Sequence, residues 1–151
     1  IRDLMYTLPE NKASDARPAL AFLNHSLRRR SIVFLVTDGI SLPAMERELR
    51  ITAARHDLIL VLVEDQRERA MPDVGLIELE DPETGEETIW DTSDPASVAK
   101  FMDEAHRNRA ELLARAKRLG IDVIRLTAGE SVIRPICRLF AEREKRAASG
   151  G

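Results

Sequence analysis

The chain has 151 residues, of which 44% are hydrophobic and 32% are charged, and its formal net charge is −3. This length fits one domain, and the hydrophobic fraction is sufficient for a buried core. No apolar run reaches the roughly 18–20 residues that span a bilayer, and no signal peptide pattern is present. The single Cys137 rules out an internal disulfide and a cysteine-based metal site.

Negative charge is concentrated in one stretch of the sequence. Twelve acidic residues lie between Glu64 and Asp94, and only Arg67 and Arg69 oppose them. A surface of this kind repels phosphate backbones, so we expect no nucleic-acid partner for that face.

The first expected elements are a helix and a strand. We expect a helix or linker over residues 1–13, followed by a helix that Ser14 and Asp15 cap and that ends near Arg28. Residues 31–37 form a continuous apolar run rich in β-branched side chains. Such a run predicts a strand buried on both faces, as in a parallel sheet.

A second helix and strand follow, and then a hairpin. The apolar spacing predicts a helix over residues 43–55 and a buried strand over residues 58–63. Alternating apolar and polar residues over 74–80 and 86–90, on both sides of a turn with Pro and Gly, predict a β-hairpin.

The C-terminal part is expected to contain two helices around a strand. Asp94 opens a long helix with an apolar stripe, and Gly120 ends it. A strand over residues 121–126 and a last helix capped by Ser131 follow, and residues 144–151 are expected to be a frayed tail.

This order of elements predicts an α/β fold with a Rossmann-like, three-layer parallel sheet flanked by helices and an inserted β-hairpin. Three parallel strands are fewer than the about five or six that are usual, so we expect the sheet to be cut short. The start at Ile1, without a methionine, leads us to expect a fragment, a processed chain or an incomplete start.

Ligands of open parallel sheets bind at the carboxyl ends of the strands. Asp38 follows the strand over residues 31–37 and precedes Gly39, where its carboxylate could hold a hard cation or could cap the following loop. Ser14 could supply an oxygen ligand or only cap its helix.

Other reactive side chains show no catalytic pattern. His25, His56 and His106 have no metal-ligand spacing and are expected at the surface or at helix ends. Cys137 falls on the apolar face of the last helix and is expected in the core. No nucleophile and base pair is recognisable.

Several stretches resemble a known family. They are Ala19-Leu20-Ala21-Phe22-Leu23, the run Arg28-Arg29-Arg30-Ser31-Ile32-Val33-Phe34-Leu35, the triplet Arg55-His56-Asp57, and the segment from Glu64-Asp65 through Met71-Pro72-Asp73-Val74-Gly75 to Asp91-Thr92. From about Ser14 to Arg143 the chain resembles a bacterial family of von Willebrand factor A-like proteins. This family is catalogued as domain of unknown function fifty-eight and is often encoded beside MoxR-type AAA+ ATPases.

The resemblance implies that residues 1–151 are a single, partial von Willebrand factor A-like domain. The adhesion metal site of such domains needs Asp-x-Ser-x-Ser on one loop, a Thr on a second and an Asp on a third. Asp38 matches the third and Ser14 stands at the second, but the first motif is absent. The resemblance thus implies an incomplete metal site, with no cofactor in this chain and Mg²⁺ only in the full-length parent.

The function implied by the resemblance is a non-enzymatic protein-interaction module, with a protein partner such as a MoxR-type AAA+ ATPase. One alternative is a metal-free structural domain that binds partners through the acidic hairpin or an exposed sheet edge. Another is a small metal-dependent hydrolase using Asp38 and Asp65. Missing strands would leave residues 31–37 at an edge, so we expect a homo-oligomer joined there. We expect a cytoplasmic location and leave open a membrane anchor in the parent.

Overall fold

The computed structural model describes residues 15–64, 73–80 and 87–149. The expected N-terminal segment 1–13 and the turn of the hairpin lie outside the described residues. The described elements, in chain order, are α2 (Arg17–Ser26), β1 (Ile32–Thr37), the 3-10 helix η1 (Leu42–Met45), α3 (Glu46–Arg55), β2 (Asp57–Glu64), β3 (Leu76–Glu80), β4 (Glu87–Asp91), α4 (Pro95–Arg118), β5 (Asp122–Thr127) and α5 (Ile133–Ser149).

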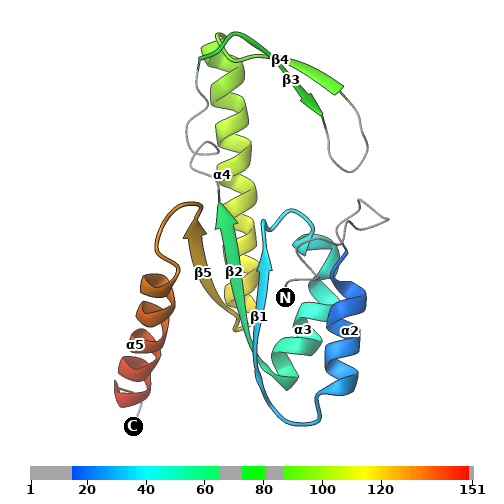
Figure 1. Cartoon of the computed structure of the whole chain (residues 1–151), viewed down its shortest axis with the longest axis vertical. Helices are drawn as coiled ribbons and strands as arrows, with labels where there is room; N and C mark the ends of the chain where they lie inside the picture. Colours follow the sequence, from blue (N-terminus) through cyan, green and yellow to red (C-terminus); the bar gives the residue numbers. More distant parts are fainter. Residues whose placement is uncertain (1–14, 65–72, 81–86, 150–151) are drawn as a thin grey trace.

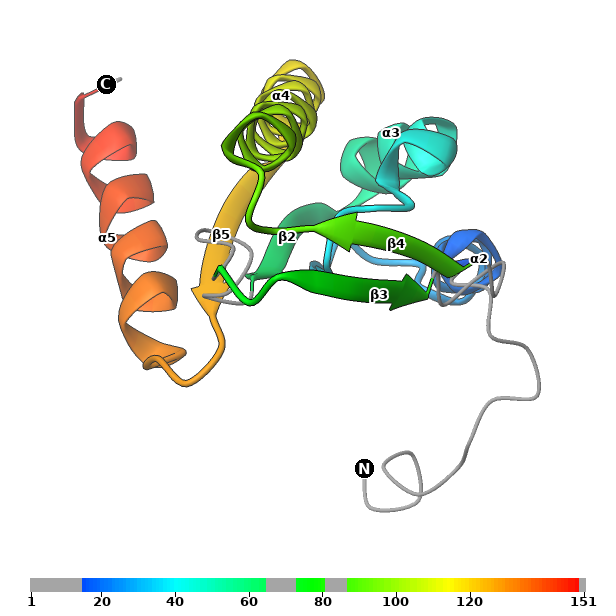
Figure 2. The ribbon, with the colours of Figure 1, turned by 90° about the horizontal axis from the view of Figure 1, so that it is seen from above.

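The main sheet has three parallel strands in the order β1-β2-β5. Helices α2, α3 and α4 lie on one face of this sheet and α5 lies on the other (Figures 1 and 2). The predicted α/β class, with a small parallel sheet flanked by helices, is therefore confirmed.

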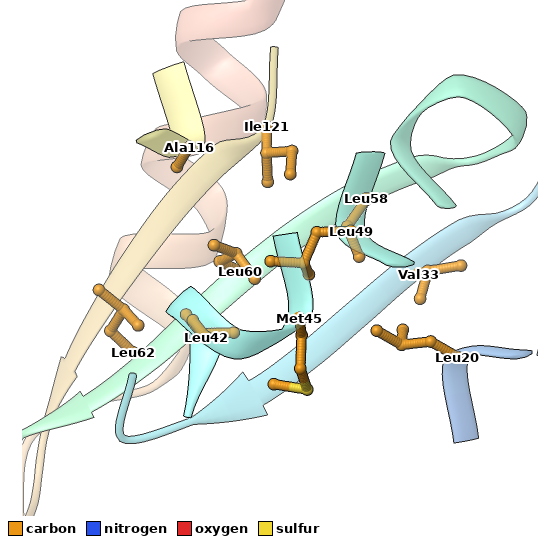
Figure 3. Packing of buried hydrophobic residues seen from close by; sticks show 10 residues of the cluster. All are labelled: Leu20, Val33, Leu42, Met45, Leu49, Leu58, Leu60, Leu62, Ala116 and Ile121. Carbon is orange, nitrogen blue, oxygen red and sulfur yellow. The ribbon is translucent and has the colours of Figure 1, made fainter. Parts of the chain in front are cut away.

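The larger core lies between the sheet and the helices α2, α3 and α4. Leu58, Leu60 and Leu62 alternate along β2 and point toward these helices, where they meet side chains such as Met45 (Figure 3). Full burial of a Leu or Met side chain contributes about 1.5–3 kcal/mol relative to exposure. This repeated burial fixes the register of β2, because a shift by one residue would turn every leucine to the other face.

The smaller core lies between the sheet and α5. Leu139 packs against Ile59, Val61 and Ile124, which alternate with the residues of the larger core.

At the amino ends of the strands, the guanidinium of Arg143 donates to both carboxylate oxygens of Asp57 at 2.6 and 2.8 Å and to Asp122 at 2.7 Å. These hydrogen bonds raise the pKa of Arg143, with the bonds to Asp57 contributing most.

The expectation that residues 31–37 are buried on both faces is wrong. Val33 is buried, but Ile32, Phe34 and Val36 are exposed on the face that carries α5. The reason is geometric, because α5 packs over β2 and β5 and β1 stands at the edge of the described sheet.

The start of α2 differs from the expected cap. Its N-cap residue is Ala16, which makes no side-chain capping bond. The carboxylate of Asp15 instead accepts hydrogen bonds from the guanidinium of Arg17 and then from its backbone N–H, which lower the pKa of Asp15 in that order of importance. Ser14 lies outside the described residues. The expected helix over residues 43–55 is likewise split, since its first turn is η1.

The predicted ends of α4 are confirmed. Asp94 caps the first turn by accepting from the backbone N–H groups of Ala96 and Ser97, and Gly120 follows the helix with a φ of +68°. The expected apolar stripe is covered only in the second half, where Ala116 is buried. The first half projects beyond the sheet and carries the hairpin (Figure 1). Helix α5 continues to Ser149, past residue 144, where we expected a frayed tail.

Candidate functional site

The three parallel strands end at the same edge of the sheet. Thr37 pairs with Leu62, and Glu64 at the end of β2 pairs with Thr127 at the end of β5. Asp38 follows directly after β1 at this carboxyl edge, where the arrowheads of the strands lie in Figure 1. Ligands of parallel sheets bind at such an edge, which makes it the candidate functional site.

The side chain of Asp38 is exposed, and one of its two carboxylate oxygens accepts hydrogen bonds from the surrounding loop. Its Oδ1 accepts from the backbone N–H of Ile40 at 3.0 Å, so the expected capping role is present. Its Oδ2 has no hydrogen-bond partner in the described part of the chain. One carboxylate oxygen of Asp38 is therefore available to a partner or cation.

Gly39 shapes the loop that carries Asp38. Its φ is +94°, a conformation that residues with a side chain rarely adopt. A Cβ at this position would lie 2.7 Å from Cδ1 of Leu112 on α4. The glycine thus lets α4 approach the loop closely.

Glu64 has the opposite environment. It is 3% exposed, and its carboxylate accepts two hydrogen bonds from Arg125, from Nε at 2.8 Å and Nη2 at 2.9 Å. The Nε of Arg109 on α4 lies 3.5 Å from Glu64 Oε1. The bonds to Glu64 raise the pKa of Arg125. Two guanidinium groups thus neutralise this carboxylate.

Glu64 and its two arginines were not predicted as a unit from the sequence. One signal was present, since Glu64 continues the alternation of Leu58, Leu60 and Leu62 and must face the helices. That signal predicts a buried carboxylate in need of a cation. It cannot identify Arg109 and Arg125 as the cations, because they lie far away in the sequence.

The described residues do not fit a magnesium ion. They contain no group of three or more His, Cys, Asp or Glu side chains that could hold a metal. Ser14 and Asp65 lie outside the described residues. Mg²⁺ prefers near-octahedral oxygen coordination, and the free oxygen of Asp38 is one ligand only.

The expectation for Cys137 is wrong, whereas His56 lies at the end of α3, as expected, but is buried. His56 is 2% exposed, and neither of its ring nitrogens has a hydrogen-bond partner within the described residues. His56 is the single residue between α3 and β2, two elements that pack against each other. Cys137 is exposed, because α5 contacts the sheet through the face of Ile136, Leu139 and Phe140. His25 and His106 are exposed, as expected.

A groove that the sequence did not predict lies between β5 and α5. It has a volume of about 610 Å³, and its lining includes Thr127, Ser131, Arg134 and Arg138. Both signs of charge line it, because Glu130 and Glu142 face the same space.

Comparison with known proteins shows the family of the chain. Residues 1–111 match the family described as Protein of unknown function DUF58, and the chain belongs to this family. Uncharacterised proteins of Mycobacterium bovis and Mycobacterium tuberculosis are each 30% identical over 148 residues, which is 95% of this chain and 46% of the relative. An uncharacterised protein of Mycobacterium avium is 28% identical over 142 residues, covering 94% of this chain and 83% of the relative.

The chain thus spans about half the length of the first two relatives. No solved structure matches it. Among the described helices, none has the length and apolar character that crossing a membrane requires.

Proposed function

We propose that the domain is a non-enzymatic protein-interaction module that binds a protein partner at the carboxyl edge of its sheet. The observation that supports this proposal is the contrast between the two acids at that edge. Glu64 is buried and neutralised by two arginines, whereas Asp38 is exposed and one of its carboxylate oxygens has no hydrogen-bond partner among the described residues. The free carboxylate is suited to bind a cationic group.

The family resemblance adds detail to the proposal. It suggests a Rossmann-like, von Willebrand factor A-like domain, a MoxR-type AAA+ ATPase as the partner, and Mg²⁺ dependence only in the full-length protein. The additional oxygen ligands would come from parts of the protein outside the described residues.

The proposal is tested by binding of the full-length protein to a MoxR-type ATPase from the same organism, with and without Mg²⁺. We expect Asp38→Ala to weaken binding at least about tenfold, which is 1.4 kcal/mol. The control is Asp103→Ala, which removes an exposed acid from α4 and leaves binding unchanged. Equal affinity of the Asp38→Ala variant and the natural protein would contradict the proposal.

A second candidate function is metal-free binding through an exposed sheet edge or the acidic hairpin. The observation that favours the edge is the row of Ile32, Phe34 and Val36, which leaves an apolar stripe open on β1. Unpaired strand edges with apolar side chains associate with other chains.

Light scattering tests this second candidate on the chain itself. We expect a dimer whose mass does not change with Mg²⁺ and which Phe34→Lys converts to a monomer. A natural chain that is monomeric at all concentrations would show that β1 does not join copies of the chain.

A further inference from the structure

The β3–β4 hairpin has two faces of different character. Its antiparallel register pairs Ile77 with Trp90, and their side chains share one face of the hairpin. This face is partly buried, and the ring of Trp90 meets the ring of Phe101 on α4 edge-on at a centroid distance of 4.6 Å. The first face therefore attaches the hairpin to α4.

The second face is open and apolar at its centre. Leu76 pairs with Asp91 and Ile89 pairs with Glu78, so the two apolar side chains are diagonal neighbours on this face. Each of them is 72% exposed, and Val74, just before β3, is also exposed. The hairpin stands apart from the main sheet, at the end of α4 (Figures 1 and 2). An apolar row of this kind, bordered by polar groups, is typical of a protein-interaction surface.

All charges that the described hairpin residues bring to this face are negative. Glu78, Glu87 and Asp91 are exposed, and residues 73–80 and 87–94 contain no Lys, Arg or His. Glu78 and Glu87 form no ion pair with any residue that the structure describes. These carboxylates around the apolar side chains attract a cationic segment and repel anionic membranes and nucleic acid.

The base of the hairpin is held in place before any partner binds. The hydroxyl of Thr92 accepts from the backbone N–H of Val74 at 3.0 Å and donates to the carbonyl of Gly75 at 2.7 Å. The backbone N–H of Thr92 donates to the same carbonyl at 2.9 Å, and its side chain is buried. A surface that is already ordered loses less conformational entropy on binding.

We propose that the open face of the hairpin binds a cationic amphipathic segment of a protein partner. Apolar side chains of the segment pack on Val74, Leu76 and Ile89, and its Lys or Arg side chains lie against the surrounding carboxylates. This inference rests on the metal-free candidate function above and adds the chemistry of the partner. It does not involve Asp38.

The probe for the test is a fluorescein-labelled amphipathic helical peptide of Leu and Lys, about 18 residues or five turns long. Its binding to the whole chain is measured by fluorescence anisotropy at low and high salt. We expect Leu76→Ser/Ile89→Ser to raise Kd at least about tenfold, because the apolar contact is removed while every charge remains. We expect Glu78→Gln/Glu87→Gln to raise Kd about threefold to tenfold and to reduce its salt dependence.

Matched controls separate a specific surface from general attraction between opposite charges. Glu142→Gln/Glu144→Gln removes two exposed acids from α5 and should leave Kd unchanged. A peptide of Leu and Glu should not bind. Asp38→Asn should keep full affinity for the probe, so a failure of the carboxyl-edge proposal can be told apart from a failure of this one.

Three outcomes would overturn the inference. The first is unchanged affinity of the Leu76→Ser/Ile89→Ser variant when circular dichroism shows that it is folded. The second is an equal loss of affinity in the hairpin variant Glu78→Gln/Glu87→Gln and in the α5 control Glu142→Gln/Glu144→Gln. The third is a dimer of the natural chain that Leu76→Ser/Ile89→Ser converts to a monomer, since the occupant would then be a second copy.

Discussion

At the scale of single residues, Asp38 and Glu64 lie at the ends of neighbouring strands but have different roles. Glu64 is the fourth member of the alternating row that begins with Leu58, so it points toward the helices, where Arg109 of α4 and Arg125 of β5 reach it. Asp38 lies in the loop after β1, where its side chain is exposed. A partner can therefore reach Asp38, which lies just beyond its strand, but not Glu64, which is the last residue of its strand and is buried.

Replacement of Arg125 by Met should destabilise the protein. Breaking a buried ion pair by removing one partner costs about 3–5 kcal/mol, and the half-exposed Arg125 and the remaining Arg109 place the expected cost at the low end, about 3 kcal/mol. Urea denaturation measures this loss. The double variant Glu64→Gln/Arg125→Met should regain part of this stability. A double variant that is less stable than Arg125→Met would contradict an ion pair between Glu64 and Arg125.

Asp94→Ala should lower the melting temperature in a way that depends on pH. Hydrogen bonds from the Ser97 hydroxyl, and then from the N–H groups of Ala96 and Ser97, hold the pKa of Asp94 below its usual 3.8. A carboxyl with a depressed pKa stabilises the fold above its unfolded pKa, and this contribution is lost as the pH falls through the folded pKa. The difference between the two proteins should be constant near neutral pH and should shrink in acid.

Thermal denaturation at a series of pH values checks this prediction. Asp103→Ala, which removes an acid from the same helix away from its cap, should change the melting temperature little at any pH. A difference between the natural protein and Asp94→Ala that grows in acid would show that the cap is not the cause.

Local roles could be predicted from the sequence at both ends of α4 but not at the start of α2, where Ala16 is the N-cap residue, and distant partners could not be predicted. The cap at Asp94 and the glycine at Gly120 depend on neighbouring residues only, and both predictions are confirmed. The burial of His56 and the arginines around Glu64 depend on how α3, α4 and β5 are placed, which no local pattern contains.

At the scale of elements, the hairpin and α4 form a unit that projects beyond the sheet (Figure 1). The sequence predicted each of these elements because the periodicities of strand and helix differ. It did not show that only the second half of α4 meets the sheet. That depends on helix length, since the three strands have at most eight residues each and α4 has 24.

Trp90→Ala should loosen the hairpin without unfolding the domain. The edge-on pair of Trp90 and Phe101 contributes about 0.5–1.5 kcal/mol beyond the burial of its area, and a two-stranded hairpin is marginally stable alone. We expect faster limited proteolysis within residues 73–94 and a nearly unchanged melting temperature. Ile89→Ala, on the open face of the hairpin, is the control, and the protease should cleave it at the same rate as the natural protein.

At the scale of the whole molecule, the sheet separates two cores of unequal size. The larger one joins α2, α3 and α4 to the sheet, and the smaller one attaches α5. The sequence predicted a small parallel sheet flanked by helices, because alternating helices and strands allow few arrangements. It did not predict that α5 leaves β1 uncovered, since that depends on which strands α5 packs against, and these are β2 and β5.

Leu139→Ala should therefore free α5 before the rest unfolds. Removal of a buried leucine side chain costs about 2–5 kcal/mol, and the small core of α5 offers few other contacts to compensate. Hydrogen exchange should accelerate in residues 133–149 and stay slow in β2. The exposed Ile133 provides the control, because Ile133→Ala should leave exchange unchanged. Uniform acceleration in all elements would contradict a separable α5.

The exposed position of Cys137 on α5 gives the protein a built-in attachment point for a reporter dye. It is the only cysteine in the sequence, so a maleimide fluorophore will label one position without any engineered substitution. The dye would sit on an exposed position of α5, and Trp90 on β4, which contacts Phe101 of α4, supplies the only tryptophan of the sequence as a second fluorescent signal. Detachment of α5 and movement of the hairpin can thus be followed in the same sample at two separate wavelengths.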